Sequence, residues 1–377
     1  MAKTQMEIEK KFPRILFITA RSDLGGGPQH LFDLCSELKT QHPECFFAIA
    51  AADEEPFAQR YKELAHDFIA LPKRSFKLKS FKELLFFCRK NKINLIHSHG
   101  RGGGIYARLL ALIGGISVIH TFHGIHIPKT PLGILKLFID YCFIPLTKHF
   151  ICVSQDEQIK VKELHLAPLK KVSVILNGVD LKKIDLCPNS PKTSTIKIGT
   201  LARFNYQKGL DLQLKILSSF IQKFPEFDLE VLITGNGEDW QKTIEQHKTL
   251  PFSLSQKIKL IGPTNSPLNF LKQLDFYISF SRWEGLPLSV LEAMGSRLPC
   301  LLSNVTGHRD LAKDKAVILF ELNDPLDFEK KFLALLKNPD EAKNLGLKAR
   351  LDVERKFTRQ LMGTKTFELY QIMELTN

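Results

Sequence analysis

Residues 275–293 read D-F-Y-I-S-F-S-R-W-E-G-L-P-L-S-V-L-E-A, and this stretch decides the fold. The apolar run 275–280 is typical of a buried strand. Pro287 suits the first turn of a helix, where its missing N–H costs nothing, so a helix is expected directly after the strand. Glu284 then falls in the loop at the carboxyl end of a strand, which is where open α/β sheets bind ligands.

The start of this helix predicts an anion site. Unpaired amides of Leu288, Ser289 and Val290 would point into the crevice, and helix N-termini attract negative charge. Glu292, one or two turns into the helix, can reach the same crevice. With Glu284 on the other side, the arrangement suits a sugar joined to a diphosphate.

The same alternation of short apolar strands and amphipathic helices runs through the chain, which predicts parallel sheets covered on both faces. Thirteen strands are expected, at residues 14–19, 46–51, 68–71, 95–97, 118–120, 150–153, 172–176, 196–200, 229–234, 258–261, 275–280, 299–303 and 317–320. Residues 187–195 (C-P-N-S-P-K-T-S-T) resemble a linker. The fold class is therefore α/β, with two Rossmann-like doubly wound domains, residues 1–190 and 191–357, facing a deep cleft.

Length and composition agree with two soluble domains. The 377 residues are 44% hydrophobic and 25% charged, which are ordinary globular values. The polar N-terminus indicates no signal peptide, and residues 131–146 are too short and too charged to span a bilayer. Seven cysteines without a C-x-x-C pair argue against disulfides and zinc, and Cys35, Cys88, Cys142 and Cys152 are expected to be buried, reduced thiols.

The net charge of +13 is concentrated in the first half. Residues 1–191 hold 27 Lys+Arg against 18 Asp+Glu, and residues 73–92 hold eight basic residues against one acid. Ser80 and Glu83 have the spacing of a capping box for an amphipathic helix. Such a basic helix fits an anionic membrane surface or is an ordinary solvated face. No nucleic-acid module accompanies it, so nucleic acid is not an expected partner.

Two glycine clusters follow strands of the first half. Gly25, Gly26 and Gly27 would let the backbone approach a ligand at a helix start, or would simply form a tight turn. Gly102-x-Gly104 matches a relaxed dinucleotide fingerprint, but no acid follows to hold a ribose, so NAD is not expected.

Five histidines, His97, His99, His120, His123 and His126, crowd two strand ends. Each could be a hydrogen-bonded loop histidine, and together they could bind a metal. No carboxylate stands beside them, and zinc sites usually have a tighter ligand set. A histidine that lines the cleft and donates to a phosphate or a sugar hydroxyl is the better functional interpretation.

In the second half, Arg203 ends the first strand and Lys208 begins the next helix, so both are expected above the sheet edge that carries Glu284. Two fixed cations there suit a diphosphate leaving group, although either alone could be a surface residue. Gly235 and Gly237 form another loop of close approach after a strand. The chain has no D-x-D motif, so the protein itself must neutralise the diphosphate and no metal is expected.

In this order, the motifs resemble the retaining glycosyltransferases of family 4, which have the GT-B fold, and the resemblance covers nearly the whole chain. It implies that Gly25 and Gly26 lie near the sugar and diphosphate, and that His123 of T-F-H-G lies near the donor sugar. It also implies that the final helix, within residues 358–377, crosses back onto the first domain. Asn177–Asp180 (N-G-V-D) matches the motif that closes the first domain.

The same resemblance assigns the second-domain residues. Arg203 and Lys208 would contact the diphosphate, and Gly235 and Gly237 the nucleotide. Glu284 would contact the donor sugar, and Glu292 the ribose hydroxyls. Trp283 departs from the family, which often has Phe or another residue there, and its ring would shape the sugar pocket.

The expected activity is therefore metal-independent, retaining transfer of a sugar from a nucleotide-sugar, with a UDP-sugar favoured. The expected acceptor is a lipid-linked saccharide or glycolipid of surface polysaccharide or lipopolysaccharide synthesis. The enzyme would be cytoplasmic, or peripheral on the inner face of the cytoplasmic membrane. Two alternatives stay open at this point: a GT-B nucleotide-sugar epimerase, and a non-enzymatic protein that binds nucleotide-sugars at a membrane surface.

Overall fold

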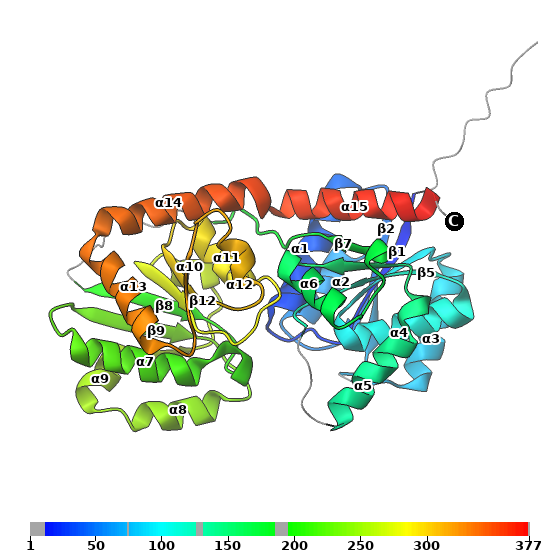
Figure 1. Cartoon of the computed structure of the whole chain (residues 1–377). Helices are drawn as coiled ribbons and strands as arrows, with labels where there is room; N and C mark the ends of the chain where they lie inside the picture. The colour runs from blue at the N-terminus through cyan, green and yellow to red at the C-terminus, as the bar shows by residue number, and fades with distance from the viewer. Residues whose placement is uncertain (1–11, 74, 126–130, 185–194, 376–377) are drawn as a thin grey trace, which may run out of the picture.

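The computed structural model describes residues 12–73, 75–125, 131–184 and 195–375. They form two α/β domains side by side, each built on one parallel sheet (Figure 1). The doubly wound fold expected from the sequence is confirmed. The expected linker, apart from Thr195, and His126 lie outside the described residues.

The first sheet has seven strands in the order β3-β2-β1-β4-β5-β6-β7. Their bounds are β1 Arg14–Thr19, β2 Phe46–Ala52, β3 Asp67–Leu71, β4 Leu95–His99, β5 Ser117–Thr121, β6 His149–Cys152 and β7 Val172–Val174. The order turns back between β1 and β4, which makes that edge a topological switch point where doubly wound sheets bind ligands.

The second sheet has six strands in the order β10-β9-β8-β11-β12-β13. Their bounds are β8 Ile196–Leu201, β9 Leu229–Thr234, β10 Ile258–Gly262, β11 Phe276–Ser279, β12 Cys300–Ser303 and β13 Ile318–Phe320. Here the order turns back between β8 and β11, the strands that precede Arg203 and Glu284.

Helices cover both faces of each sheet. In the first domain they are α1 Gly26–Gln41, α2 Phe57–Leu64, α3 Leu78–Lys90, α4 Gly100–Gly114, α5 Pro131–Cys142 and α6 Gln155–Glu163, with short 3₁₀ turns η1 Ile144–Leu146 and η2 Leu169–Lys171. In the second they are η3 Tyr206–Lys208, α7 Leu210–Lys223, α8 Trp240–Lys248, α9 Phe252–Lys257, α10 Pro267–Leu271, α11 Leu288–Gly295, α12 His308–Leu311, α13 Pro325–Lys337 and α14 Pro339–Lys356.

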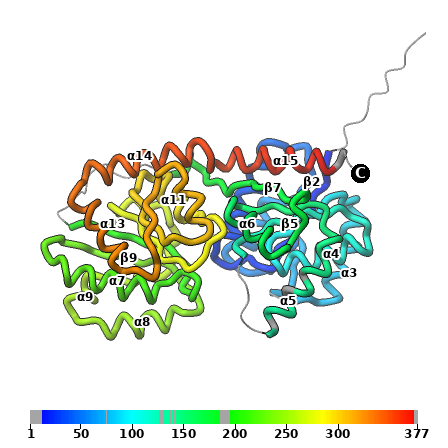
Figure 2. The backbone as a smooth tube through the Cα atoms, in the orientation of Figure 1, coloured from blue at the N-terminus to red at the C-terminus, as the bar shows by residue number. Residues whose placement is uncertain are grey.

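The last helix, α15 (Arg359–Leu375), leaves the second domain and packs on the first. Met362, Phe367 and Tyr370 are buried in the same core cluster as α1. Figures 1 and 2 show α14 along the second domain and α15 continuing along the first. The two domains are thus joined by two crossings of the chain.

These two crossings are hydrogen-bonded to each other. Val179 N donates to Phe357 O (2.9 Å), and Arg359 N donates to Val179 O (3.0 Å). Gly178 packs so closely on Thr358 that a Cβ there would collide with its carbonyl. Arg359 also forms ion pairs with Glu37 (2.8 Å) and Asp180 (3.2 Å), and these pairs fix the start of α15.

Three local expectations were wrong. The capping box fails because α3 begins at Leu78, which puts Ser80 inside the first turn, and the cap residue is Lys77. Pro287 is the cap of α11 rather than a residue of its first turn, because its ψ of 119° is extended. Cys142 is exposed, because α5 does not lie in the core.

The second glycine cluster has a packing role. Gly102 and Gly103 lie in α4, where a Cβ would collide with Ala20 and with the Ile18 carbonyl. These two glycines let α4 lie directly on β1, so close packing requires glycine at Gly102 and Gly103.

Candidate active site

An ion pair between Lys208 and Glu284 forms the centre of the site. Lys208 Nζ lies 2.5 Å from Glu284 Oε1, and the side chains are 18% and 6% exposed. Lys208 ends η3, and Gly209 follows with φ +63° against the Phe280 carbonyl, where a Cβ would collide. The turn therefore brings Lys208 over the end of β11.

Neighbouring polar groups fix the Glu284 carboxylate. Ser281 Oγ donates to its Oε1 (2.6 Å), and the Gln207 amide donates to its Oε2 (3.3 Å). Burial opposes ionisation, but the charges of Lys208 and His308 and the hydrogen bonds from Lys208 and Ser281 outweigh it and lower the pKa of Glu284. The residue is therefore a fixed carboxylate, suited to accept hydrogen bonds from sugar hydroxyls or to stabilise positive charge.

The Glu284 loop contacts the loop of the first domain that carries His123. A Cβ on Gly285 would lie 2.9 Å from the amide of Gly124, so the two backbones approach as closely as glycines allow. His123 and Glu284 each precede one of these glycines. Residues from the two domains thus meet in one site.

Glu157, from α6, holds the His123 loop in place. Its carboxylate accepts hydrogen bonds from Gly124 N (2.7 Å) and Val153 N (2.8 Å). Burial raises the pKa of Glu157 to about 7, against the effect of these two amides. Sequence reasoning missed this residue because its role depends on a backbone contact 33 positions away.

Arg203 reaches across from the second domain to the glycine loop of the first. Its guanidinium donates to the Leu24 carbonyl and lies 3.7 Å from an Asp23 oxygen. A Cβ at Gly25 would collide with the Arg203 guanidinium, so a larger residue there would displace the end of this flexible side chain. Gly26, exposed, opens α1. Arg203 thus stands at a helix N-terminus, where both would favour an anion.

The loop of Gly235 and Gly237 supports the backbone around Arg203. Phe204 N donates to Asn236 O (3.0 Å), and a Cβ on either glycine would collide with a backbone carbonyl on one side of Arg203 or the other. The loop therefore holds the backbone on both sides of Arg203 in place.

Helix α11 starts beside the same ion pair. Its first backbone hydrogen bond runs from Leu291 N to Pro287 O (3.2 Å), so the amides of Leu288, Ser289 and Val290 have no acceptor within the helix. The Asn177 amide of the first domain donates to Leu286 O (2.7 Å) and joins this helix start to the interface.

Glu292 of α11 faces Asp33 of α1 across the domain interface. Burial, and then repulsion from Asp33, raise the pKa of Glu292 to about 8. Burial also raises the pKa of Asp33 to about 6. At neutral pH Glu292 therefore holds a proton.

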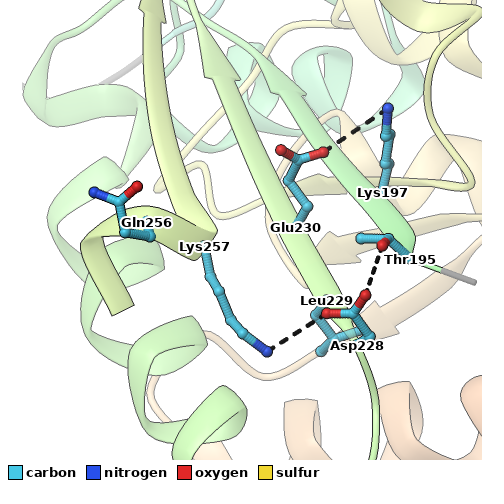
Figure 3. A pocket seen from close by; sticks show the side chains of 7 residues that line it. All are labelled: Thr195, Lys197, Asp228, Leu229, Glu230, Gln256 and Lys257. Carbon is cyan, nitrogen blue, oxygen red and sulfur yellow. Dashed lines mark hydrogen bonds and ion pairs between the residues drawn. The ribbon is translucent and has the colours of Figure 1, made fainter. Parts of the chain in front are cut away.

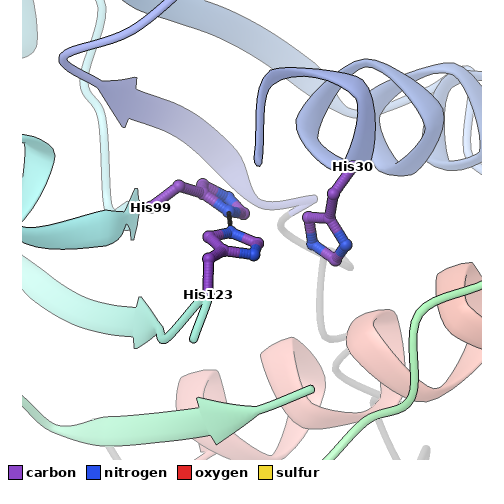
Figure 4. Close-up of side chains that lie close together, drawn as sticks. All are labelled: His30, His99 and His123. Atoms are coloured by element: carbon purple, nitrogen blue, oxygen red, sulfur yellow. Dashed lines mark hydrogen bonds between the residues drawn. The ribbon is translucent and has the colours of Figure 1, made fainter. Parts of the chain in front are cut away.

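His30 of α1, His99 at the end of β4 and His123 form a cluster (Figure 4). A hydrogen bond joins His99 Nδ1 and His123 Nε2 (3.1 Å), and one nitrogen from each of the three rings lies within 4.8 Å of the others. Burial lowers the pKa of all three rings, that of His30 to about 4, so they are neutral at pH 7. In the described part of the chain, this is the group that could hold a metal such as zinc, as a set of imidazoles alone.

A hollow of about 350 Å³ lies elsewhere on the second domain (Figure 3). It is lined by Thr195, Lys197, Asp228, Leu229, Glu230, Gln256 and Lys257. These residues stand at the amino ends of β8, β9 and β10, and their charges pair with one another, as in Lys257–Asp228 (3.6 Å) and Lys197–Glu230 (3.8 Å). It lies at the sheet edge opposite Glu284, so it does not compete as the active site.

The structure therefore gathers most of the residues expected from the sequence at one interface. Lys208 and Glu284 are in direct contact, the Arg203 segment rests on the Gly235 loop, and His123 lies across from Glu284. Sequence reasoning missed Gln207, Ser281, Glu157, Asp33 and His308. Ser281 stood within the decisive stretch, and its three-residue spacing from Glu284 was the available signal.

Comparison with known proteins gives a consistent result. Residues 24–183 match the family model "Glycosyltransferase Family 4", and residues 187–352 match "Glycosyl transferases group 1". Over 262 residues the chain is 31% identical to an Escherichia coli UDP-Gal:alpha-D-GlcNAc-diphosphoundecaprenol alpha-1,3-galactosyltransferase, covering 66% of this chain and 67% of that protein. It is 24% identical over 317 residues to the E. coli O-antigen biosynthesis glycosyltransferase WbnH, covering 83% and 88%.

Among solved structures, the chain is similar to Anabaena Alr3699/HepE, crystallised with UDP and glucose. The TM-score is 0.82 at 13% identity, with 95% of this chain and 99% of that chain covered, which is a likeness of fold.

Proposed function

The chain belongs to glycosyltransferase family 4, and from this premise we propose that it transfers a sugar from a UDP-sugar to a lipid-linked saccharide. It is a glycosyltransferase of the GT-B fold. The proposal adds three points: the donor is a UDP-sugar, the reaction retains configuration at the anomeric carbon, and no metal ion takes part.

The observation that carries the proposal is the Lys208–Glu284 pair beside the start of α11, with Arg203 on the same sheet edge. As the sugar–phosphate bond breaks, negative charge grows on the departing diphosphate. Lys208, Arg203 and the amides of α11 supply positive charge in fixed positions, and such preorganised charge is usually the largest contribution to catalysis. This is also the support for metal independence, because the protein supplies the charge that a metal would otherwise provide.

The stereochemical proposal follows from the same geometry. Glu284 is held by Lys208 and Ser281, so its oxygens are committed to hydrogen bonds rather than free to attack an anomeric carbon. We propose that the acceptor attacks from the face that the diphosphate leaves, and that a departing phosphate oxygen takes the acceptor proton. His123 and Glu284 would hold the donor sugar between the two domains.

The relatives support the acceptor and the donor. One is named as a galactosyltransferase that uses UDP-Gal and a diphosphoundecaprenol-linked sugar, and another as an O-antigen glycosyltransferase. We propose the same class of acceptor here, used at the cytoplasmic face of a membrane. No helix in the described ranges is long and apolar enough to cross a bilayer.

The test has two stages. Thermal shift with UDP-, GDP- and ADP-sugars identifies the donor, and the largest stabilisation is expected with a UDP-sugar. The chosen donor is then incubated with a short-chain GlcNAc-diphospholipid, with and without EDTA, and the product linkage is read by NMR.

An α-linked product formed equally with EDTA is expected. A β-linked product would exclude retention, and loss of activity with EDTA that zinc or magnesium restores would exclude metal independence. Interconversion of the donor sugar without acceptor would indicate an epimerase. The Glu284→Gln variant, with turnover reduced and nucleotide binding kept, controls for a contaminating transferase.

A further inference from the structure

Helix α5 presents an apolar face to solvent. Ile134, Leu135, Phe138, Ile139 and Tyr141 are 57%, 54%, 64%, 38% and 37% exposed. At 100° per residue these five positions fall on one side of the helix. A surface helix normally turns its polar face outward, so an outward apolar stripe marks an interaction site.

This helix stands off from the core of the first domain. Helix α5 packs on η1, which in turn packs on α4, and α4 packs on α3. The Tyr141 hydroxyl at the end of α5 donates a hydrogen bond to the Leu164 carbonyl. Figures 1 and 2 show α5 at the lower edge of the first domain, near α3 and α4. The apolar face is therefore on a protrusion, not in a groove that a peptide would fill.

Positive charge lies on the same part of the domain. Seven basic residues around α3 are exposed: Lys73, Lys77, Lys79, Lys82, Arg89, Lys90 and Lys92. Two apolar side chains lie among them at the start of α3, Phe76 (43% exposed) and Leu78 (60%). Phe76 rests on Tyr106 of α4, with ring centroids 4.9 Å apart.

We propose that the apolar face of α5 and the basic surface of α3 together dock this enzyme on an anionic lipid bilayer. An amphipathic helix lying in the interface buries its apolar residues among the acyl chains while basic residues bind anionic headgroups. Binding at the interface strengthens with buried apolar area and with attraction to anionic lipids, and here α5 supplies the first and α3 the second.

A bilayer fits these observations better than a second copy of the chain. Two copies meeting through this surface would bring the basic residues of α3 together, and like charges oppose association. An anionic bilayer complements both the charge and the protruding shape. The inference rests on the proposed function in one respect: a lipid-linked acceptor would be met at such a surface.

Vesicle flotation of the full chain tests the surface without donor or acceptor. We expect binding to phosphatidylcholine vesicles with 30% phosphatidylglycerol, little binding to pure phosphatidylcholine, and a decrease as salt rises. Ile134→Ser and Phe138→Ser should each lower the partition coefficient about tenfold, from the value of burying a large apolar side chain. Lys77→Gln, Lys79→Gln and Lys82→Gln should each lower it about fivefold.

Phe252→Ser is the matched control, because Phe252 is 79% exposed at the start of α9 in the second domain. It should bind vesicles as the natural chain does. Phe138→Trp adds a direct readout: its fluorescence should shift to the blue with anionic vesicles, and that of Phe252→Trp should not.

Unchanged flotation of Ile134→Ser and Phe138→Ser would overturn the proposal, as would a concentration-dependent dimer in light scattering that these variants abolish. Transfer to a water-soluble acceptor analogue separates this outcome from failure of the proposed function. Variants of α5 that no longer bind vesicles but still transfer sugar to the soluble analogue would support both the docking surface and the proposed function. A chain that binds vesicles through α5 but transfers no sugar leaves the docking surface standing and removes the proposed function.

Discussion

The Lys208–Glu284 pair couples stability to function at the level of two residues. Removing Lys208 leaves a buried carboxylate without its cation, and breaking a buried pair in this way costs about 3–5 kcal/mol. We expect Lys208→Ala to lower the free energy of unfolding by about that amount. The double variant Lys208→Ala/Glu284→Gln should recover part of the loss, because no uncompensated charge remains. Urea unfolding of the natural chain, Lys208→Ala, Glu284→Gln and the double variant gives the coupling energy of the pair.

The same variants separate binding from structure. Arg203→Ala should weaken binding of the nucleoside diphosphate by about 1.5–3 kcal/mol, the range for hydrogen bonds to charged groups, with little change in stability. Isothermal titration measures this. Equal affinity in a folded Arg203→Ala/Lys208→Ala protein would remove both residues from the diphosphate site.

Glu292 predicts how stability depends on pH. Its pKa is raised to about 8 in the folded protein, so the folded state holds a proton that the unfolded chain has released above pH 4.5. The stability gained from this proton is complete at low pH and is lost as pH rises through about 8. Glu292→Gln should therefore flatten the fall in unfolding free energy between pH 5 and 8.5.

Glu245→Gln, an exposed residue of the same domain, is the control and should keep the natural slope. If Glu292→Gln kept the full slope as well, the proton would belong to another group, such as Asp33, whose pKa is raised to about 6.

At the level of elements, α15 completes the core of the first domain. Tyr370 is fully buried, and its hydroxyl bonds His97 Nδ1 (2.6 Å) while His97 Nε2 bonds Thr121 Oγ1 (2.7 Å). Tyr370→Phe would leave a buried ring nitrogen without its partner, which costs about 1–3 kcal/mol. Thermal unfolding should show this loss, whereas Tyr206→Phe, 62% exposed, should not.

The strands could be predicted well from the sequence, but the tertiary contacts that hold the site residues in place could not. All thirteen strands were found because parallel strands are continuous apolar runs, and period and composition are local properties. Lys208 and Glu284 could be brought together because both follow strands of one sheet. Glu157 and Asp33 could not be placed in the site, because their partners come from loops and helices whose packing cannot be predicted from local sequence patterns. Ser80 misled because helix α3 starts three residues earlier than its capping motif indicated.

At the level of the whole molecule, much of the site exists only where the domains touch. Arg203 reaches Leu24, Gly285 abuts Gly124, and Glu292 faces Asp33. Another charged contact, Arg309–Asp156 (2.9 Å), joins α12 to α6. A donor bound to one domain would thus find its remaining partners on the other, so binding and domain closure favour each other.

The two crossings bonded at Val179 and Thr358 restrict how that closure can occur. Two separate tethers would let the domains translate and twist, whereas two tethers joined by hydrogen bonds at Val179 would favour rotation about the line through them. Asn177, two residues from this axis, holds the start of α11. For a given angle, displacement grows with distance from the axis, so the helix start would keep its register with the first domain while contacts at larger radius separate. The domains would then open about a hinge axis that passes close to the anion site at the start of α11.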